Sequence, residues 1–175
     1  MDEFDYGYIQ KGIHVLKGVN FMDDYMKAAI DEAFIGISQK DGGPFGAVIV
    51  KDGEIIARGH NKVVSTHDPT AHAEIVAIRE AASLLKRFDL SDCELITTCE
   101  PCPMCYSAIH WARIGRVVYG ATRKDAAEIG FDDNLLYEFL SGKRVDNQLK
   151  LEQNSRAACL EVFDMYMKDS DRTPY

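Results

Sequence analysis

Three of the five cysteines in the chain lie within residues 99–105, and this cluster restricts the local fold more than any other feature of the sequence. Cys102 and Cys105 form a Pro-Cys-x-x-Cys pattern between a short apolar segment and an amphipathic one. Two thiols three residues apart in the first turn of a helix point in the same direction, so they can bind one metal ion. The pattern therefore predicts a strand that leads into a helix, with both thiols at the junction.

A second short motif, His72-Ala73-Glu74, begins another expected helix. His72, Cys102 and Cys105 would supply three protein ligands and leave the fourth tetrahedral position open, as catalytic zinc requires and structural zinc does not. Glu74 is then expected to move protons rather than to act as a fourth ligand. His-x-Glu together with Pro-Cys-x-x-Cys is the general signature of zinc nucleobase deaminases, so we expect one Zn²⁺ per subunit.

Other classes of protein carry parts of this pattern. A lone Cys-x-x-Cys is typical of thioredoxin-like redox proteins, and two such pairs are typical of structural zinc ribbons. The redox interpretation leaves His72 and Glu74 unexplained, and no second pair lies outside residues 99–105. A non-catalytic zinc module is the alternative from a different class, and the intact Glu74 argues against it. Cys93 and Cys159 are expected to be buried thiols remote from the metal.

Segments with helical and strand periodicity alternate along the chain. The Asp-Gly turn at residues 52–53 predicts a hairpin. This order predicts a three-layer α/β/α sandwich with a mixed central sheet. Helices are expected over 22–38, 71–86, 102–112, 134–140 and 156–167, strands over 45–50, 55–59, 94–98 and 116–121, an edge strand over 148–151, and a loop over 61–70. Residues 1–20 are expected to be an N-terminal extension and residues 21–175 one deaminase domain with its C-terminal tail.

The charge balance limits the partners of the chain. There are 28 Asp and Glu residues against 20 Lys and Arg, which gives a net charge of −8. An acidic protein without a basic patch is not expected to bind nucleic acid. No apolar run is long enough to cross a membrane, and the N-terminus does not have the pattern of a secretory signal. Clustered cysteines favour a metal site in a reducing compartment, so a cytoplasmic protein is expected.

The motifs resemble those of the cytidine deaminase-like superfamily, and most closely those of its guanine deaminase branch. The metal motif is shared by all branches, whereas Gly-Phe-Asp-Asp at 130–133 and the terminal Tyr175 indicate the guanine branch. The resemblance is carried by residues 42–50, 60–61, 68–74, 99–105, 108–113 and 126–133.

The resemblance implies hydrolysis of guanine to xanthine and ammonia, by attack of zinc-bound hydroxide with Glu74 as proton shuttle. It also implies that Asp133 assists near the exocyclic amine, that Trp111 lines the pocket of a neighbouring subunit, and that Tyr175 closes a site. The residues expected to bind substrate are Phe45, Asn61, Ala73, Trp111 and Tyr175. A guanosine deaminase is the near alternative; cytosine and tRNA adenosine deaminases are more distant.

Each of these roles has a structural alternative. Phe45 could be a core residue, Asn61 could hold its loop, Asp133 could cap a helix, and Trp111 could pack in the core or an interface. The family usually pairs through the helix that begins at Cys102, so a homodimer that acts on a small purine is expected.

Overall fold

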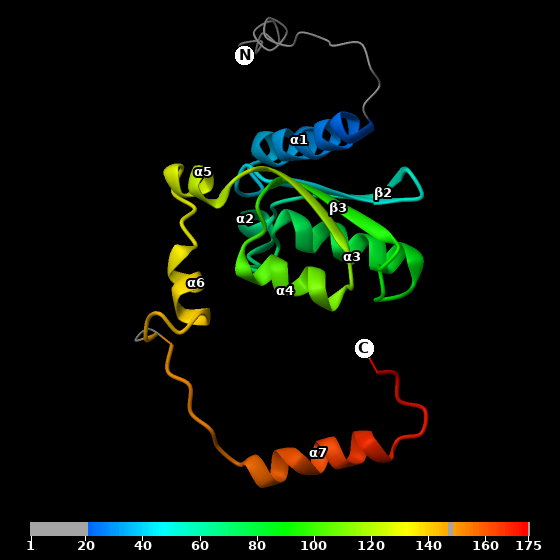
Figure 1. Cartoon of the computed structure of the whole chain (residues 1–175), viewed down its shortest axis with the longest axis vertical. Helices are drawn as coiled ribbons and strands as arrows, with labels where there is room; N and C mark the ends of the chain where they lie inside the picture. The colour runs from blue at the N-terminus through cyan, green and yellow to red at the C-terminus, as the bar shows by residue number, and fades with distance from the viewer. Residues whose placement is uncertain (1–20, 147–148, 175) are drawn as a thin grey trace, which may run out of the picture.

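A computed structural model describes residues 21–146 and 149–174 (Figure 1). Its helices and strands follow the expected alternation. In chain order they are α1 (Phe21–Gln39), β1 (Gly46–Lys51), β2 (Glu54–His60), α2 (Val63–Thr66), α3 (Ala73–Leu85), β3 (Cys93–Cys99), α4 (Pro103–Trp111), β4 (Arg116–Ala121), α5 (Arg123–Glu128), α6 (Asn134–Leu140) and α7 (Arg156–Lys168).

The strands of the described residues form one mixed sheet in the order β2-β1-β3-β4. β1 pairs antiparallel with both β2 and β3, and β3 pairs parallel with β4. The hairpin between β1 and β2 turns at Asp52 and Gly53, both with positive φ, 51° and 81°. This backbone is that of a type I′ turn, which the Asp-Gly pair favours. The mixed sheet and the hairpin are confirmed.

Helices cover both faces of the sheet, and successive β1 residues alternate between them. Val48 and Val50 pack with Ala28 and Ala29 of α1 on one face. Ala47 and Ile49 face the other layer, where α3 and α4 pack (Figure 1). Gly46 lets α1 approach the sheet closely, because an added Cβ there would lie 2.0 Å from the carbonyl oxygen of Ala29. The three-layer α/β/α sandwich is therefore confirmed.

Four local expectations were wrong. The loop expected over 61–70 contains the single-turn helix α2, and α5 follows β4 where no helix was expected. Residues 149–151 do not form the expected edge strand; they are exposed, and residue 148 lies outside the described residues. Cys159 is exposed on α7 rather than buried. The two missed helices are too short to show a helical period in sequence.

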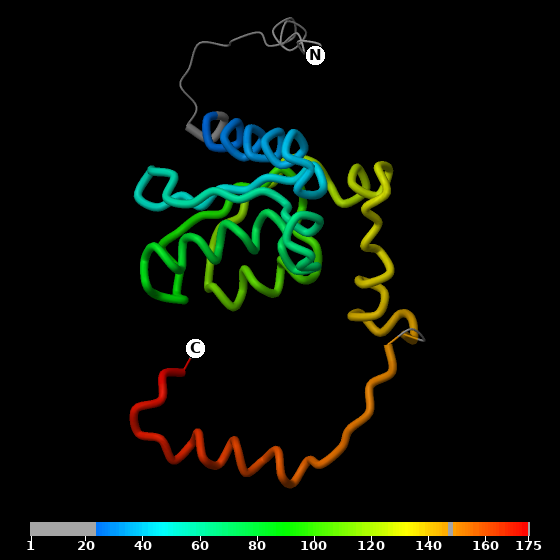
Figure 2. The backbone as a smooth tube through the Cα atoms, turned by 180° about the vertical axis from the view of Figure 1, so that it is seen from behind, coloured from blue at the N-terminus to red at the C-terminus, as the bar shows by residue number. Residues whose placement is uncertain are grey.

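The C-terminal helix α7 lies apart from the α/β layers in two views related by 180° (Figures 1 and 2). Every residue of α7 except Leu160 is exposed.

Within the described part of the chain, no helix combines the length and the apolar character needed to cross a membrane. The expected N-terminal extension (1–20) and Tyr175 lie outside the described residues.

Candidate metal centre and active site

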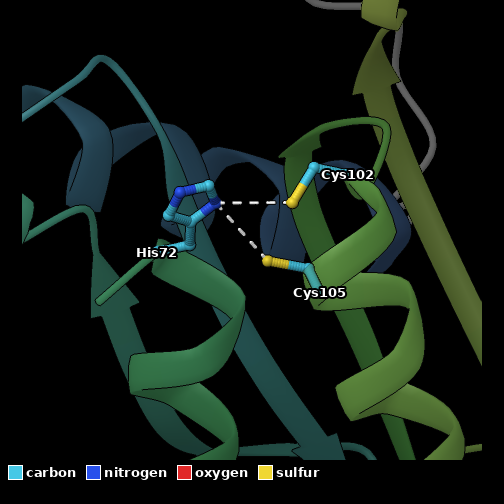
Figure 3. Close-up of side chains that lie close together, drawn as sticks. All are labelled: His72, Cys102 and Cys105. Carbon is cyan, nitrogen blue, oxygen red and sulfur yellow. Dashed lines mark hydrogen bonds between the residues drawn. The ribbon is translucent and has the colours of Figure 1, made fainter. Parts of the chain in front are cut away.

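Two helix starts on the same side of the sheet bring the three candidate ligands together. His72 is the N-cap residue of α3, with extended backbone angles, and Cys102 is the N-cap residue of α4. Pro103 occupies the first turn of α4, where its missing N–H and fixed φ suit a helix start. Cys105 lies one turn into α4 and is fully buried. The imidazole of His72 therefore points across at both thiols (Figure 3).

The spacing of the donor atoms fits one zinc ion. Nδ1 of His72 lies 3.6 Å from Sγ of Cys102 and 3.6 Å from Sγ of Cys105. Nitrogen and sulfur ligands at tetrahedral angles around Zn²⁺ lie about 3.5 Å apart, from bond lengths of about 2.05 and 2.3 Å. The three ligand atoms all lie within 4.8 Å of one another. The geometry thus matches a tetrahedral site with three protein ligands.

The electrostatics of the cluster favour a thiolate. Hydrogen bonds from the Cys105 thiol and from His72 lower the pKa of Cys102 to about 4. The bond to Cys102 in turn raises the pKa of His72. The positive end of the α4 dipole adds to this effect. Zn²⁺ requires neutral imidazole and thiolates, so metal binding would displace the protons that the cluster holds.

Glu74 lies beside this cluster on the first turn of α3. It is 6% exposed. Burial raises the pKa of its carboxyl group. A carboxyl group of raised pKa holds a proton more readily near neutral pH, as a general acid and base requires. Glu74 is therefore suited to move protons next to the metal.

A cavity of about 450 Å³ opens onto the cluster. Its volume is typical of a small-molecule site. His72, Glu74 and Cys102 line it, and its other lining residues include Phe45, Asn61, Asp133, Phe131 and Arg123. The rings of Phe45 and Phe131 pack edge to face, with centroids 5.0 Å apart and planes at 86°. Three residues expected to contact the substrate or its amine, namely Phe45, Asn61 and Asp133, thus lie around the cavity that contains the metal cluster.

Asn61 and Asp133 differ in what else they do. The Asn61 side chain holds its loop, since Oδ1 accepts the N–H of Val63 at 3.1 Å. Asp133 occupies the N-cap position of α6 but makes no side-chain cap hydrogen bond. The neighbouring Asp132 makes the local bond instead, and accepts the N–H of Asn134 at 2.9 Å. Asp133 therefore lines the cavity without serving as a cap, and burial raises the pKa of its carboxyl group.

Two expected site residues, Trp111 and Ala73, do not line this cavity, and a third is not described. Trp111 is 66% exposed and lines a groove between α3 and α4 rather than the cavity of its own chain. Ala73 is fully buried and packs in the core under the sheet. Tyr175 lies outside the described residues. Their roles toward substrate stay predictions.

Sequence reasoning missed Phe131, Arg123 and Glu100, which also line the cavity. The guanidinium group of Arg123 lies over the ring of Tyr137, 4.4 Å from its centroid. The backbone N–H of Arg123 donates to Oε2 of Glu100 at 3.0 Å. Phe131 and Glu100 lie within segments 126–133 and 99–105, which carried the resemblance, so those segments were an available signal for two of the three residues.

The sandwich, the His-Cys-Cys cluster and the adjacent buried carboxyl group define a zinc-dependent deaminase. Residues 20–121 match the family of the cytidine and deoxycytidylate deaminase zinc-binding region. This match covers more than half of the chain, and the chain belongs to that family.

The chain is also similar to characterised members. It is 44% identical over 153 residues to guanine deaminase of Bacillus subtilis (strain 168), covering 87% of this chain and 98% of that protein. The X-ray structure of the Bacillus subtilis enzyme matches over the same shares with a TM-score of 0.82. A tRNA-specific adenosine deaminase of Streptococcus pyogenes serotype M18 is 39% identical over 145 residues, 82% of this chain and 88% of that protein. A guanine deaminase structure from Nitrosomonas europaea matches at 35% identity with a TM-score of 0.59, over 70% of this chain and 66% of that chain.

Proposed function

We propose that this enzyme catalyses the zinc-dependent hydrolysis of guanine to xanthine and ammonia. The observation that carries the proposal is one cavity that joins the His72, Cys102 and Cys105 cluster and Glu74 to Asp133. The 44% identity to a guanine deaminase over nearly the whole of that protein supports guanine as the substrate.

His72, Cys102 and Cys105 would hold the zinc ion. When bound there, zinc lowers the pKa of its water ligand to about 7, so hydroxide is available at neutral pH. The Glu74 carboxylate would accept one proton of the attacking water and pass it to a ring nitrogen. It would then accept the remaining proton, from the hydroxyl group added at C2, and pass it to the departing amine, so that two protons are taken up and two are delivered. One buried carboxyl group beside the metal cluster thus serves both transfers.

The remaining cavity residues orient the base. The ring of Phe45 packs against the purine, and the Asn61 side chain hydrogen-bonds to its edge. The Asp133 carboxylate accepts the N–H of the exocyclic amine and holds C2 toward the metal. Phe131, edge-on to Phe45, completes the aromatic wall. A base bound among these groups would displace water, which strengthens each polar contact.

An assay of ammonia release over guanine, guanosine, cytosine and adenine tests the substrate. We expect guanine to be the preferred substrate by at least tenfold. Preference for guanosine would favour the near alternative, a nucleoside deaminase. A tRNA anticodon stem-loop belongs in the same assay, because tRNA deaminases are also relatives. The net charge of −8 disfavours that polyanionic substrate.

The homodimer expected from the sequence is likewise a proposal. Trp111 and Tyr106 of α4 are 66% and 58% exposed, and Phe163 and Met165 of α7 are 63% and 71% exposed. Apolar surface of this extent is typical of an interface. We expect sedimentation to give twice the chain mass; a fully active monomer would contradict the dimer.

The thiolate-forming cysteine pair suits a reducing cytoplasm, where we place the enzyme in purine metabolism.

A further inference from the structure

A buried histidine lies behind the wall of the cavity, outside the residues assigned to the reaction. His60 ends β2 and is 6% exposed. Its Nδ1 lies 3.1 Å from Oε2 of Glu32 on α1, and its Nε2 lies 2.8 Å from Oδ2 of Asp41, just after α1. The two acidic side chains are only 14% and 15% exposed. Both ring nitrogens therefore contact a carboxyl group in a mostly buried cluster.

The cluster fixes the ring in place. Ionised carboxyl groups only accept hydrogen bonds, so both nitrogens donate when the ring is an imidazolium. The hydrogen bond from His60 lowers the pKa of Asp41 below its ordinary value. The α1 backbone also comes close, since an added Cβ at Gly36 would lie 2.9 Å from Cδ2 of His60. A buried ion pair often adds little stability compared with apolar packing, so stability alone is a weak reason for this arrangement.

The residue that follows this histidine is Asn61, which lines the cavity. Its backbone N–H donates to the carbonyl oxygen of Phe45 at 3.0 Å, and its Oδ1 accepts the N–H of Val63 at 3.1 Å. A Cβ at Gly42 would lie 2.1 Å from that Oδ1. The Asn61 side chain therefore packs directly against the backbone of residue 42.

Asp41 links the cluster to the same wall from the other side. Its carbonyl oxygen accepts the N–H groups of Val64 and Ser65 at 2.9 and 3.1 Å, while its carboxyl group contacts His60. Residues 42, 43, 45, 61, 63 and 64 all line the cavity, and His60 is not among the described residues that do. The cluster thus joins two backbone segments that together form one cavity wall.

We propose that His60, held by Glu32 and Asp41, is a positioning residue that sets Asn61 and residues 42–45 against the substrate. The inference rests on the proposed function, in which Asn61 contacts the base. His60 acts on recognition of the substrate and not on the zinc cluster, which lies on α3 and α4. Its contribution passes through Asn61.

A double-mutant cycle tests this route. We expect His60→Gln to lower kcat/KM for guanine by about 10–100-fold, mainly through KM, because small displacements of positioned groups have effects of this size. Zinc content should stay at one ion per chain. In an Asn61→Ala background the same change should cost only about twofold, since coupled residues are not additive. Independent, multiplying effects, or an unchanged KM in His60→Gln, would overturn the proposal.

Two further variants complete the test, one as a substitute for His60→Gln and one as a control. Asp41→Asn retains the shape of the cluster and removes one charge, so it serves if His60→Gln does not fold; we expect the same shift in KM, smaller in size. His67→Asn is the matched control, because His67 is exposed with a positive φ of 53° that asparagine tolerates. It should stay within about twofold of wild type. A loss in the control equal to that in His60→Gln would overturn the assignment.

A measurement without substrate separates this inference from the proposed function. Wild-type enzyme that does not deaminate guanine would overturn the function. Amide exchange of Val63 and Val64 in the zinc-loaded protein tests the positioning role by itself. We expect at least about tenfold faster exchange of these two amides in His60→Gln, with α4 amides unchanged. Equal exchange in variant and wild type would overturn the role of His60, whatever the substrate is.

Discussion

The cavity has two halves that are built differently. The metal half consists of His72, Glu74 and Cys102, which line the cavity, and of Cys105, which completes the metal cluster. All four lie at the starts of α3 and α4 and are buried or half-buried. The substrate half comes from the loop residues 42–45, from Asn61, from the short helices α2 and α5, and from residues 131–133 before α6. In the substrate half, Phe131 is 46% exposed while Asn61 is 4% exposed; in the metal half, Cys105 and Glu74 are 0% and 6% exposed.

Because of this difference, we expect the metal half to determine which reaction occurs and the substrate half to determine which molecule reacts. Helix starts packed on the sheet hold ligands at fixed spacing, as a metal site requires. Loops accept substitutions more readily, so related proteins can change the wall that contacts the base. The chain resembles both guanine and tRNA adenosine deaminases, which agrees with a common metal half and a variable substrate half. Changes in the metal half should therefore abolish turnover, whereas changes in the substrate half should alter selectivity.

Removal of zinc should have the largest effect. Chelation should reduce ammonia release below detection, and added Zn²⁺ should restore it, because the His-Cys-Cys donor set suits a soft or borderline metal. Mg²⁺ is the matched control and should not restore activity. The metal-free protein should also unfold several degrees lower, since an ion that binds only the folded state stabilises it. Full activity in metal-free protein would contradict the assignment of the metal half.

Glu74→Gln should lower kcat by about 10²–10⁴-fold, the usual contribution of a positioned acid and base. The amide keeps the size of the side chain but cannot carry the proton. Zinc content, measured by atomic absorption, should stay at one ion per chain, because Glu74 is not one of the three candidate ligands. Glu80→Gln changes an exposed residue of the same helix and should leave turnover intact. Unchanged turnover in Glu74→Gln would refute the proposed proton shuttle.

The substrate half can be probed with two adjacent carboxyl groups. Asp133→Asn should reduce kcat/KM for guanine by about 10–100-fold, which corresponds to one charge-assisted hydrogen bond. Asp132→Asn is the matched control: its Oδ1 accepts the N–H of Asn134, and an asparagine oxygen can do the same. That variant should stay within about twofold of wild type. Equal losses in both variants would assign the effect to the α6 turn rather than to the substrate.

The two halves also differ in how far the sequence predicts them. The metal half follows from local motifs, because each motif lies where a strand or loop meets a helix and the spacing fixes which side chains share a face. The substrate half depends on contacts between distant segments, such as the approach of Phe131 to Phe45. No local pattern indicates that approach. Nor could the sequence decide which of Asp132 and Asp133 holds the α6 turn.

One of the missed helices, α5, could have been predicted from a local pattern in the sequence. α5 begins with a capping box, in which Thr122 and Asp125 bond each other's backbone N–H groups, and the Thr-x-x-Asp pattern is readable in sequence. The error at Cys159 has a different cause: the helical period of α7 is real, but no other part of the described chain covers it. Periodicity shows that a helix has an apolar face and not what the face packs against.

The smallest effect should come from an ion pair that joins the segments after α3 and α4, the two helices whose starts carry the metal ligands. Asp89 follows α3, and its Oδ2 accepts a hydrogen bond at 2.8 Å from Arg113, which follows α4. Hydrogen bonds from Ser91 and this contact with Arg113 lower the pKa of Asp89 to about 2 from the ordinary 3.8. A lowered pKa stabilises the folded state above pH 3.8, and this contribution is lost as pH falls toward 2. At pH 7, Asp89→Asn should therefore lower the urea midpoint by roughly 0.3 M or less, as expected of a surface ion pair. The difference from wild type, measured at the same pH so that metal release affects both proteins alike, should shrink toward zero near pH 2. A difference that persists undiminished in acid would assign the role of Asp89 to packing and not to its charge.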